Sequence, residues 1–471
     1  MPVIFDDRAA FELRVPVLVV GAGACGLVAA LAARDGGAEV LVLERDAAPS
    51  GSTALSSGFV PAAGTRFQRA AGVTDSAELL AADIRRKNHG QADPGIVDAV
   101  ARASAPAVEW LADRHAVPFV LLTGFLYPGF SVERMHTVPE KTGAALMTHL
   151  LRATSAAGVD LLCDARVADL FATRDGRVRG ARFVRPDGAL ETVGCDALVL
   201  ACSGFGGNPG MVARYIPELA GVDYFGHAGN QGDAVEWGLA LGAKPADMTA
   251  YQGHGSVATP HGVLITWALM MEGGIQVNAR GERFSNEHDG YSEQCVRVLA
   301  QPGRVAWNVY DERLHALAMT FPDYRDAAAA GAIRHAPDAA ALAQLVGAPA
   351  DAFGRTLAAC DAFAEGRAAD PFGRDFTGKP KLVPPYFAVK VTGALFHTQG
   401  GLEIDPDARV VRGDRTPLPN VFAGGGAARG VSGAHVWGYL SGNGLLTAVT
   451  LGRIAGAGAA TASASPGDRT A

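Results

Sequence analysis

Three glycines near the N-terminus have the spacing of a phosphate-binding turn. They lie in the sequence GAGACG at 21–26, between an apolar run at 15–20 and an alanine-rich stretch at 27–35. A strand, a glycine turn and a helix in this order bring unpaired backbone N–H groups to an anion. A second apolar run ends at Glu44, 18 positions after Gly26, where a carboxylate can accept hydrogen bonds from ribose hydroxyls. The pattern predicts a dinucleotide-binding βαβ unit; the alternatives are a turn needed only for packing and a solvated charge at Glu44.

A segment rich in hydroxyl side chains and glycine follows this unit at once. It reads SGSTALSSG at 50–58 and carries five hydroxyls. Such a segment can wrap a diphosphate and the ribityl chain of a flavin. Together with the glycine turn, it resembles the FAD-binding domain of the fumarate reductase, succinate dehydrogenase and 3-ketosteroid dehydrogenase superfamily.

Four further segments extend this resemblance over most of the chain. Residues 196–207 resemble the family's strand and ATGG turn near the flavin, 230–233 its T-G-D element, and 396–401 its H-T-x-G-G turn. Residues 421–426 resemble the last flavin-contacting strand, except that Gly426 stands where the family has a Glu. The resemblance implies FAD as the cofactor, bound by Gly21, Gly23, Gly26, Glu44, Arg45, Gly51, Ser52, Thr53, Ser57, Gly58, Val167, Ser203, Gly204, Asp233, Gly400, Gly425, Asn443, Leu445 and Leu446.

Two tyrosines and a serine occupy positions that resemble catalytic positions of 3-ketosteroid dehydrogenases. Residues 273–287 match the family's G-x-I-x-V-N-x-x-G-x-R-F-x-N-E hairpin, and Tyr291 follows it. Residues 438–442 read GYLSG and match the G-Y-x-S-G segment of the enzymes that act at the Δ4-(5α) bond. Dehydrogenation beside a ketone needs a base, a hydride acceptor and a donor to the carbonyl. The resemblance implies Tyr439 as the base, Ser441 as its relay and Tyr291 as a nearby hydrogen-bonding group; the alternative for all three is ordinary packing.

The residues that bind a dicarboxylate in fumarate reductases are replaced in this chain. Trp267 and Met270 stand where those enzymes have an Arg and a Glu, and Tyr291 stands at the place of their proton-donating Arg. The C-terminal loop at 433–438 also lacks an Arg, although a carboxylate prefers guanidinium partners. His397 alone remains of that set; it could polarise a carbonyl, or it could only hydrogen-bond the backbone.

These comparisons of residue types predict a reaction class. We expect an FAD-dependent enzyme that dehydrogenates a C–C bond next to the carbonyl of a bulky apolar ketone, a 3-ketosteroid being one candidate. The apolar run at 267–271 would suit such a substrate, but core packing explains it as well. Two alternatives stay open: reduction of an α,β-unsaturated acid or enone, and flavin binding without turnover.

The elements that must position these residues suggest a discontinuous domain. We expect an α/β fold with a doubly wound Rossmann-type FAD-binding domain, an inserted α+β cap or substrate domain, and a disordered tail rich in Ala and Ser. The expected boundaries are 1–244 and 386–456 for the FAD-binding domain, 245–385 for the cap and 457–471 for the tail. Within the cap, alanine-rich helices are expected at 327–345 and 350–367.

Composition narrows the function classes. The net charge is −7 without a long single-sign run, which argues against a nucleic-acid or anionic-membrane binder. The six cysteines have no zinc, redox-dithiol or haem spacing, so no metal site is predicted. The uncharged stretch at 15–33 fits a strand, a turn and a helix better than a membrane span. We expect a cytoplasmic enzyme with a small-molecule substrate and, because no second dinucleotide motif is present, an external electron acceptor.

Overall fold

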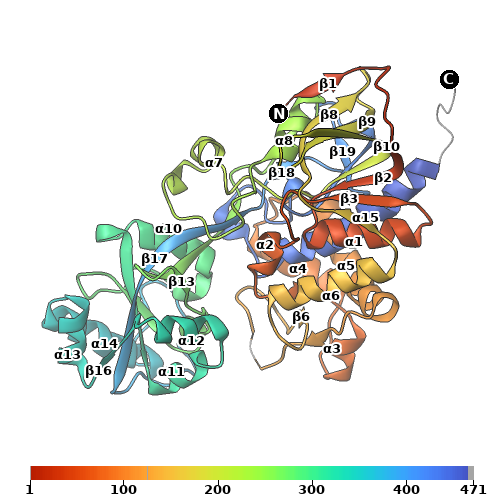
Figure 1. Cartoon of the computed structure of the whole chain (residues 1–471). Helices are drawn as coiled ribbons and strands as arrows, with labels where there is room; N and C mark the ends of the chain where they lie inside the picture. Colours follow the sequence, from red (N-terminus) through yellow and green to blue (C-terminus); the bar gives the residue numbers. More distant parts are fainter. Residues whose placement is uncertain (1, 125, 465–471) are drawn as a thin grey trace. The chain divides into compact units, whose positions relative to one another are not determined.

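The computed structural model describes residues 2–124 and 126–464 and divides them into two compact units (Figure 1). The first unit comprises the described residues up to 220, residues 224–251 and those from 397 onward. The second comprises residues 221–223 and 252–396. The limits at 252 and 396 lie seven and eleven residues after the predicted 245 and 385, because strands β12 (Tyr251–Ala258) and β17 (Tyr386–Thr398) continue the chain from one unit into the other.

A nine-stranded sheet forms the centre of the first unit. Its main path runs β1-β8-β9-β10-β2-β3-β7, and β20 pairs with β10 and β19. The pairs of β2 with β10 and β3, of β3 with β7 and of β10 with β20 are parallel. The strands are β1 (Val3–Phe5), β2 (Arg14–Val20), β3 (Val40–Leu43), β7 (Asp160–Leu162), β8 (Arg166–Ala172), β9 (Val178–Val184), β10 (Leu190–Leu200), β19 (Arg409–Val411) and β20 (Pro417–Ala423). Every residue of β3 is buried, as expected for a parallel strand covered on both faces.

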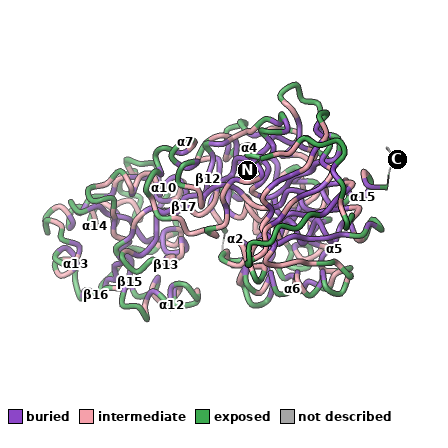
Figure 2. The backbone as a smooth tube through the Cα atoms, turned by 45° about the horizontal axis from the view of Figure 1, so that its top comes forward, coloured by how far each residue is buried: buried purple, intermediate pink, exposed green. Residues whose placement is uncertain are grey.

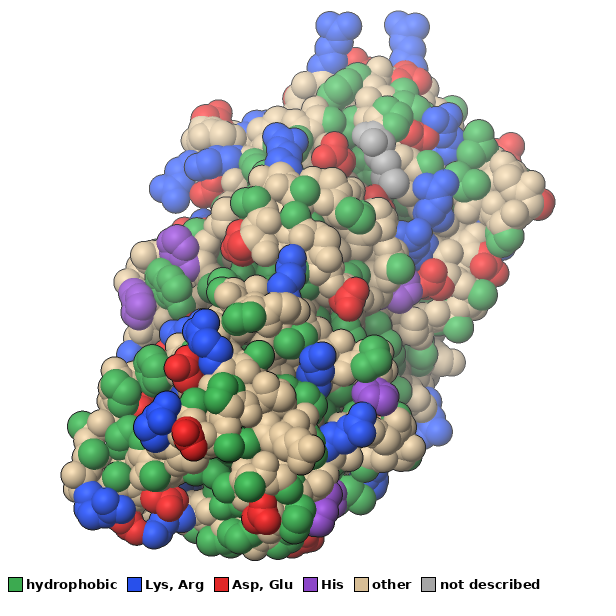
Figure 3. Space-filling model, turned by 90° about the vertical axis from the view of Figure 1, so that its left-hand side faces the viewer, with side chains coloured by type: hydrophobic (Ala, Val, Ile, Leu, Met, Phe, Trp, Pro, Cys, Tyr) green, Lys and Arg blue, Asp and Glu red, His purple; other side chains and the backbone are tan. Residues whose placement is uncertain are grey.

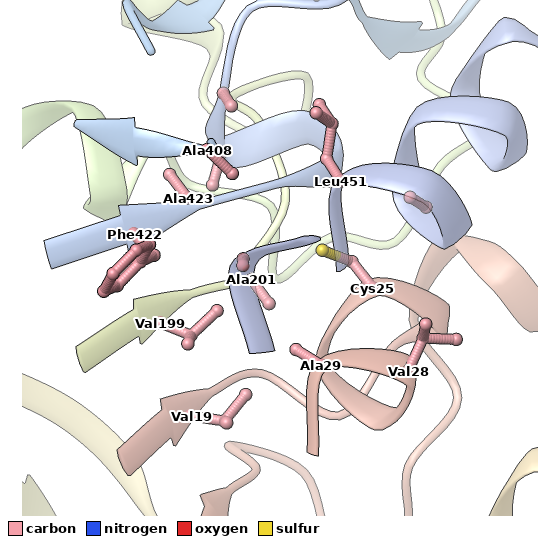
Figure 4. Close-up of a cluster of buried hydrophobic side chains, with 14 of the residues drawn as sticks. Val19, Cys25, Val28, Ala29, Val199, Ala201, Ala408, Phe422, Ala423 and Leu451 are labelled. Atoms are coloured by element: carbon pink, nitrogen blue, oxygen red, sulfur yellow. The ribbon is translucent and has the colours of Figure 1, made fainter. Parts of the chain in front are cut away.

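Helix α1 (Ala24–Asp35) packs against the C-terminal helix α15 (Asn443–Ala464), as Figure 4 shows near Cys25 and Leu451. Two glycines of α15 allow the close approach. A Cβ on Gly452 would lie 2.6 Å from the Cys25 carbonyl oxygen, and one on Gly456 only 2.0 Å from that of Ala29. The prediction of a disordered tail is therefore wrong for residues 457–464, which continue α15; residues 465–471 lie outside the described part of the chain.

Shorter elements complete the first unit, and Figure 2 shows its buried stretches in purple beneath exposed outer turns in green. Its other helices are α2 (Gly51–Ala54), α3 (Arg66–Ala70), α4 (Ala77–Lys87), α5 (Pro94–His115), α6 (Gly143–Ala156), α7 (Pro209–Tyr215) and α8 (Asp233–Ala240). Its other strands are β4 (Val60–Pro61), β5 (Val120–Leu121), β6 (Met135–Thr137), β11 (Pro245–Ala246) and β18 (Gly401–Leu402). Among the described helices, α15 meets the length and hydropathy expected of a membrane span, but 61% of its apolar window is buried, as in a core helix.

The second unit is an α+β structure built on a six-stranded sheet of order β13-β12-β17-β15-β14, with β16 paired to β17. Its remaining strands are β13 (Val263–Leu264), β14 (Ile275–Val277), β15 (Val305–Asp311) and β16 (Ile333–Ala336). Its helices are α9 (Ala268–Met271), α10 (Tyr291–Leu299), α11 (Glu312–Ala318), α12 (Pro322–Ala329), α13 (Ala339–Val346) and α14 (Ala350–Ala364).

The single helix predicted at 327–345 is wrong. Helix α12 ends at Ala329, β16 intervenes, and α13 begins at Ala339. Gly331 has a positive φ of +74° after the first helix, and the Asp338 side chain accepts a hydrogen bond from Ala341 N–H to cap the next one. The predicted helix is interrupted because the glycine after α12 and the N-cap of α13 outweigh the helix propensity of the alanines between them.

We expect acid to destabilise the first unit through His136, which is fully buried on β6. Burial lowers the pKa of His136 from 6.5 to about 4, against a smaller opposing effect of the Arg134 carbonyl. Between these values the unfolded chain binds a proton that the folded chain does not, so stability is lost as the pH falls through this window. Urea unfolding at pH 5 and pH 7 should differ by about 1–2 kcal/mol from this group. The variant His136→Asn should lose that share of the pH dependence; an unchanged dependence would contradict the assignment.

Candidate functional site

A cavity that is partly open to solvent lies in the first unit at the carboxyl ends of β2, β3 and β10. Ligands of open parallel sheets bind at this edge, where the strand order reverses. The N-terminal turns of α1 and α15 also contribute to its wall, through Ala24 and Cys25 and through Gly444 and Leu445. The positive ends of two helix dipoles therefore meet the same cavity, which suits an anionic or electron-rich ligand.

The glycine turn at 21–26 is held by two side chains that the sequence placed near it. Ala22 N–H donates to Glu44 Oε2 at 2.8 Å, and Ala24 N–H donates to Thr53 Oγ1 at 3.1 Å. Glu44 Oε1 also accepts from Asp46 N–H at 3.1 Å. Glu44, predicted as a partner for ribose hydroxyls, thus also fixes the glycine turn itself. Gly26 lies behind the wall, where a Cβ would come within 1.8 Å of the Gly21 carbonyl oxygen.

The hydroxyl-rich segment faces a loop that is distant in sequence. Ser52 Oγ accepts from the Asn230 side chain at 2.8 Å and from His227 N–H at 3.2 Å. Arg45 donates to the Gly229 carbonyl at 2.6 Å, and His227 Nε2 lies 2.9 Å from an Asp46 oxygen. This loop, 227–230, covers one end of the cavity and leads into α8, which begins at Asp233.

Asp233 carries the acidic charge of that end. Burial raises the pKa of its carboxyl, and the cations Arg45 and Arg166 oppose the rise. Both arginines line the cavity with it. The arrangement offers hydroxyl, carboxylate and guanidinium groups together, which fits the polar part of a dinucleotide.

Twelve of the predicted cofactor residues lie on the cavity wall: Gly21, Gly23, Glu44, Arg45, Gly51, Ser52, Thr53, Val167, Ser203, Asp233, Gly425 and Leu445. Seven do not: Gly26, Ser57, Gly58, Gly204, Gly400, Asn443 and Leu446. Several of the seven are sites of close backbone packing. A Cβ on Gly58 would lie 2.7 Å from Thr142, one on Gly204 2.0 Å from Thr398 Oγ1, and one on Gly400 2.3 Å from the Asp247 carbonyl oxygen.

Sequence reasoning missed wall residues that lie near predicted ones. Trp237 follows Asp233 by one helical turn, and Thr447 follows Asn443 in the same way. The helical period could have indicated both. His227 and Gln399 gave no such signal, because their places depend on loops that meet only in the fold.

The presence of glycine at 426, where the family has a Glu, has a steric reason. A Cβ there would lie 2.7 Å from Gly204 N and 3.1 Å from the Ser203 carbonyl carbon, so a Glu cannot be added to this backbone without a shift. Ser203 itself has a positive φ of +67°, a costly conformation for a residue other than glycine.

We therefore expect Gly426→Glu to destabilise the protein rather than restore a cofactor contact. Overpacking of this kind costs about 1–3 kcal/mol, and the unfolding temperature measured by calorimetry should fall by several degrees. Gly413→Glu is the matched control, because nothing lies within 4 Å of the added Cβ at that exposed position. Equal unfolding temperatures for the two variants would contradict the steric explanation.

His397 and Tyr439 contact one another in the first unit. Their rings meet edge to face with centroids 5.5 Å apart. His397 lines the cavity, its Nδ1 lies 2.9 Å from the Gln399 side-chain nitrogen, and burial lowers its pKa to about 4. Its ring also packs on Gly444, whose added Cβ would lie 2.9 Å from Cε1. The structure thus brings His397 together with the start of α15 and with Tyr439.

Tyr439 and Ser441 are both buried in the loop before α15. The Tyr439 hydroxyl accepts a hydrogen bond from Gly442 N–H at 3.3 Å. Gly442 has a φ of +80°, and an added Cβ would lie 2.6 Å from Pro61, so the turn that carries these side chains requires glycine. Neither Tyr439 nor Ser441 lies on the cavity wall itself.

Tyr291 lies in the second unit, at the first position of α10. Its ring stacks on His254 at 4.6 Å and meets Trp267 at 6.3 Å, edge to face. Burial lowers the pKa of His254 to about 3, so this imidazole is neutral. Trp267 and Met270 are buried in the same hydrophobic cluster, which is the packing alternative for that apolar run.

The segment before Tyr291 is not a regular hairpin. Strand β14 pairs with β15 and not with the segment that follows it, and ion pairs between side chains hold that segment in place. Arg283 and Arg374 contact the buried Glu287 at 2.6 and 3.0 Å. Burial favours a higher pKa for Glu287, but the positive charges of Arg374 and Arg283 outweigh this effect and lower the pKa to about 2. The motif is therefore a buried ionic support for the start of α10.

The residues of the cavity fit a flavin dinucleotide. At Gly23, on the cavity wall, an added Cβ would have only Thr53 Oγ1 within 4 Å, so the turn is open on that side. Glu44 and the hydroxyl segment match sugar and phosphate groups, and two helix N-termini suit anionic and electron-rich atoms. Among the described residues there is no group of three or more His, Cys, Asp or Glu side chains able to hold a metal ion.

Comparisons with known proteins agree with this fit. A family model described as an FAD binding domain matches residues 16–445. The NADH:fumarate oxidoreductase of Klebsiella pneumoniae (strain 342) is 31% identical over 444 residues, which are 93% of this chain and 47% of that protein. The chain thus spans about half the length of this relative.

Two solved structures are similar over nearly the whole chain. A flavocytochrome c3 fumarate reductase matches with a TM-score of 0.80 and 28% identity, over 97% of this chain and 80% of that one. The 3-ketosteroid-Δ4-(5α)-dehydrogenase of Rhodococcus jostii RHA1, solved with 4-androstene-3,17-dione, matches with a TM-score of 0.79 and 26% identity, over 98% and 99%. The predicted α/β flavoenzyme fold is confirmed.

Proposed function

Because this chain belongs to the FAD-binding-domain family, as an FAD-dependent oxidoreductase of the fumarate reductase and ketosteroid dehydrogenase type, we propose that it dehydrogenates a C–C bond next to the carbonyl group of a bulky apolar ketone. A 3-ketosteroid is the first candidate substrate. The observation that carries the proposal is the contact between Tyr439 and His397 in the unit that holds the cofactor cavity.

The two side chains have complementary tasks in this reaction. When bound, FAD supplies the hydride-accepting chemistry. Tyr439 takes the proton from the carbon next to the carbonyl, and Gly442 N–H donates to the Tyr439 oxygen and thereby favours its anion. His397, neutral because its pKa is about 4, donates a hydrogen bond to the carbonyl without delivering a full charge. Ser441 is proposed to relay protons for Tyr439, and Tyr291, in the second unit, is proposed as a further hydrogen-bonding group.

Reduction of an α,β-unsaturated acid is the second candidate. It is favoured by the similarity of this chain to the NADH:fumarate oxidoreductase of Klebsiella pneumoniae and to the flavocytochrome c3 fumarate reductase. Against it, the positions of the dicarboxylate-binding Arg and Glu hold Trp267 and Met270, both buried in an apolar cluster. A carboxylate would lack its guanidinium partners there.

The decisive experiment is anaerobic flavin reduction followed by absorbance. The purified holoenzyme is mixed with a saturated 3-ketosteroid, and the dithionite-reduced holoenzyme is mixed with a small 2-enoate. We expect bleaching by the ketosteroid and no reoxidation by the enoate. Reoxidation by the enoate alone would overturn the proposal in favour of the reductase, and no response to either compound would reject both substrates.

The proposal also includes the electron acceptor and the cellular location of the enzyme. We propose an external acceptor, since the sequence has a single βαβ dinucleotide motif. A cytoplasmic location is consistent with all six cysteines being free. Figure 3 shows one face of the molecule, on which basic and acidic side chains are interspersed, as suits a small-molecule enzyme more than a nucleic-acid binder.

A further inference from the structure

The imidazole of His397 has two different sides. Its Nδ1 lies 2.9 Å from the Gln399 amide nitrogen and 3.4 Å from the Thr398 carbonyl oxygen. Its Nε2 has no hydrogen-bond partner within residues 2–124 and 126–464, and the half-buried ring lines the cofactor cavity. Whichever nitrogen carries the proton therefore decides whether His397 offers the cavity a donor or an acceptor.

A chain of buried amide and hydroxyl groups continues from Gln399. Ser432 Oγ donates to Gln399 Oε1 at 2.9 Å and accepts from Asn443 Nδ2 at 3.2 Å. All three side chains are at most 5% exposed. Because the Ser432 hydroxyl directs its proton to Gln399 Oε1, the Gln399 nitrogen is left to face His397 and can only donate.

The backbone keeps Gln399 in this position. Gln399 N–H donates to the Ala250 carbonyl at 2.8 Å, and its own carbonyl accepts from Gly430 N–H at 2.9 Å. A Cβ added to Gly430 would approach Gln399 Oε1 to 3.0 Å, so glycine at this position leaves the space that the amide occupies. The orientation is thus built by three segments: the turn at 397–401, the loop at 430–432 and the start of α15.

From this geometry we propose that Gln399 is a positioning residue, which holds His397 as the neutral tautomer protonated on Nε2 and so presents a hydrogen-bond donor to a neutral carbonyl. The Nε2–H tautomer is a property of the protein alone; its catalytic use rests on the proposed function. A neutral donor serves a ketone oxygen, whereas a carboxylate substrate would gain more from an imidazolium. Gln399 would accordingly be a determinant of substrate class.

The contacts of the ring support a fixed neutral state. They are the Gln399 amide, the Thr398 carbonyl, the Tyr439 ring and the Gly444 backbone. No charged side chain is among the contacts that the described residues give this ring. Burial accounts for the lowered pKa of about 4, and the Thr398 carbonyl opposes it.

The first test determines the tautomer of His397 in the absence of substrate. The FAD-loaded enzyme is labelled with ¹⁵N-histidine, and long-range ¹H–¹⁵N spectra at pH 7 distinguish a protonated Nε2 from a protonated Nδ1. The variant His397→Asn identifies the signal among the 12 histidines. We expect the Nε2–H form in the wild type and its loss in Gln399→Glu, whose carboxylate accepts from Nδ1–H. A wild-type Nδ1–H form would overturn the proposal.

The second test follows the pH profile of turnover with the ketone. Gln399→Glu should raise the pKa of His397, so an additional titration appears in kcat between pH 5 and pH 8 that the wild type lacks. Gln399→Met, which offers no hydrogen bond, should lower kcat by about tenfold or more with little change in KM, since a wrong tautomer weakens transition-state stabilisation.

Gln344→Glu is the matched control, because it adds the same charge at an exposed position of α13. A pH profile that shifts equally in this control, or that stays unchanged in Gln399→Glu, would refute the positioning role. The two hypotheses fail separately. Inactivity toward ketones with an Nε2–H signal rejects the proposed function alone, and ketone turnover with an Nδ1–H signal rejects the role of Gln399 alone.

Discussion

Replacing Tyr439 by Phe is expected to leave a yellow holoenzyme that has lost its turnover. The change removes one hydroxyl from a buried ring and keeps the edge contact with His397. A base positioned at the reacting carbon contributes about 10²–10⁴-fold, so kcat for the ketone should fall by that factor. Steady-state assays give kcat, and the absorbance of the oxidised flavin gives the bound FAD.

Tyr215→Phe is the matched control for this prediction. Tyr215 is half-buried at the end of α7 in the same unit, where its ring contacts Phe205, and it does not line the cavity. We expect its turnover to equal that of the wild type. If Tyr439→Phe kept wild-type kcat, Tyr439 would have to be a packing residue, and the loop at 438–442 would lose its catalytic assignment.

Replacing Glu44 by Gln is expected to weaken FAD binding strongly while the apoprotein stays folded. The carboxylate accepts hydrogen bonds from Ala22 N–H and Asp46 N–H, and an amide can satisfy only one of them as acceptor. Hydrogen bonds to a charged group contribute about 1.5–3 kcal/mol, which corresponds to roughly 10–150-fold in Kd. Titration of the apoprotein with FAD, followed by flavin fluorescence, measures the change.

Glu39→Gln is the control for this second prediction. Glu39 directly precedes the same strand, β3, but its side chain is exposed. It should bind FAD as the wild type does. A Kd that is equal in the two variants would show that the charge at Glu44 does not hold the glycine turn.

Local patterns were the most predictable part of this chain. The glycine turn, the acid at Glu44 and the first strands follow from spacing within about thirty residues, because a βαβ unit has nearly fixed geometry. Where a residue's role depends on a distant segment, spacing gave no guidance. Ser52 meets Asn230, and Gln399 meets Ser432, through loops whose paths are set by the whole sheet.

Composition misled where small residues have a packing role. The Ala- and Ser-rich composition of 457–471 suggested a disordered tail, yet residues 457–464 continue α15, whose Gly452 and Gly456 allow it to lie against the carbonyl groups of α1. Glycine weakens an isolated helix, but a close contact with another backbone requires it. Several predicted cofactor glycines have the same explanation: Gly204 and Gly400 make room for protein neighbours rather than lining the cavity.

The position of α15 has a consequence for how the protein is made. Its first two turns supply Gly444, Leu445, Thr447 and Ala448 to the cavity, although other wall residues, such as Gly21 and Gly23, lie more than 400 positions earlier in the chain. A ribosome-bound chain therefore carries an unfinished cavity until these residues of α15 have emerged. Translation that stops before residue 443 yields a chain without the part of the cavity wall that α15 supplies.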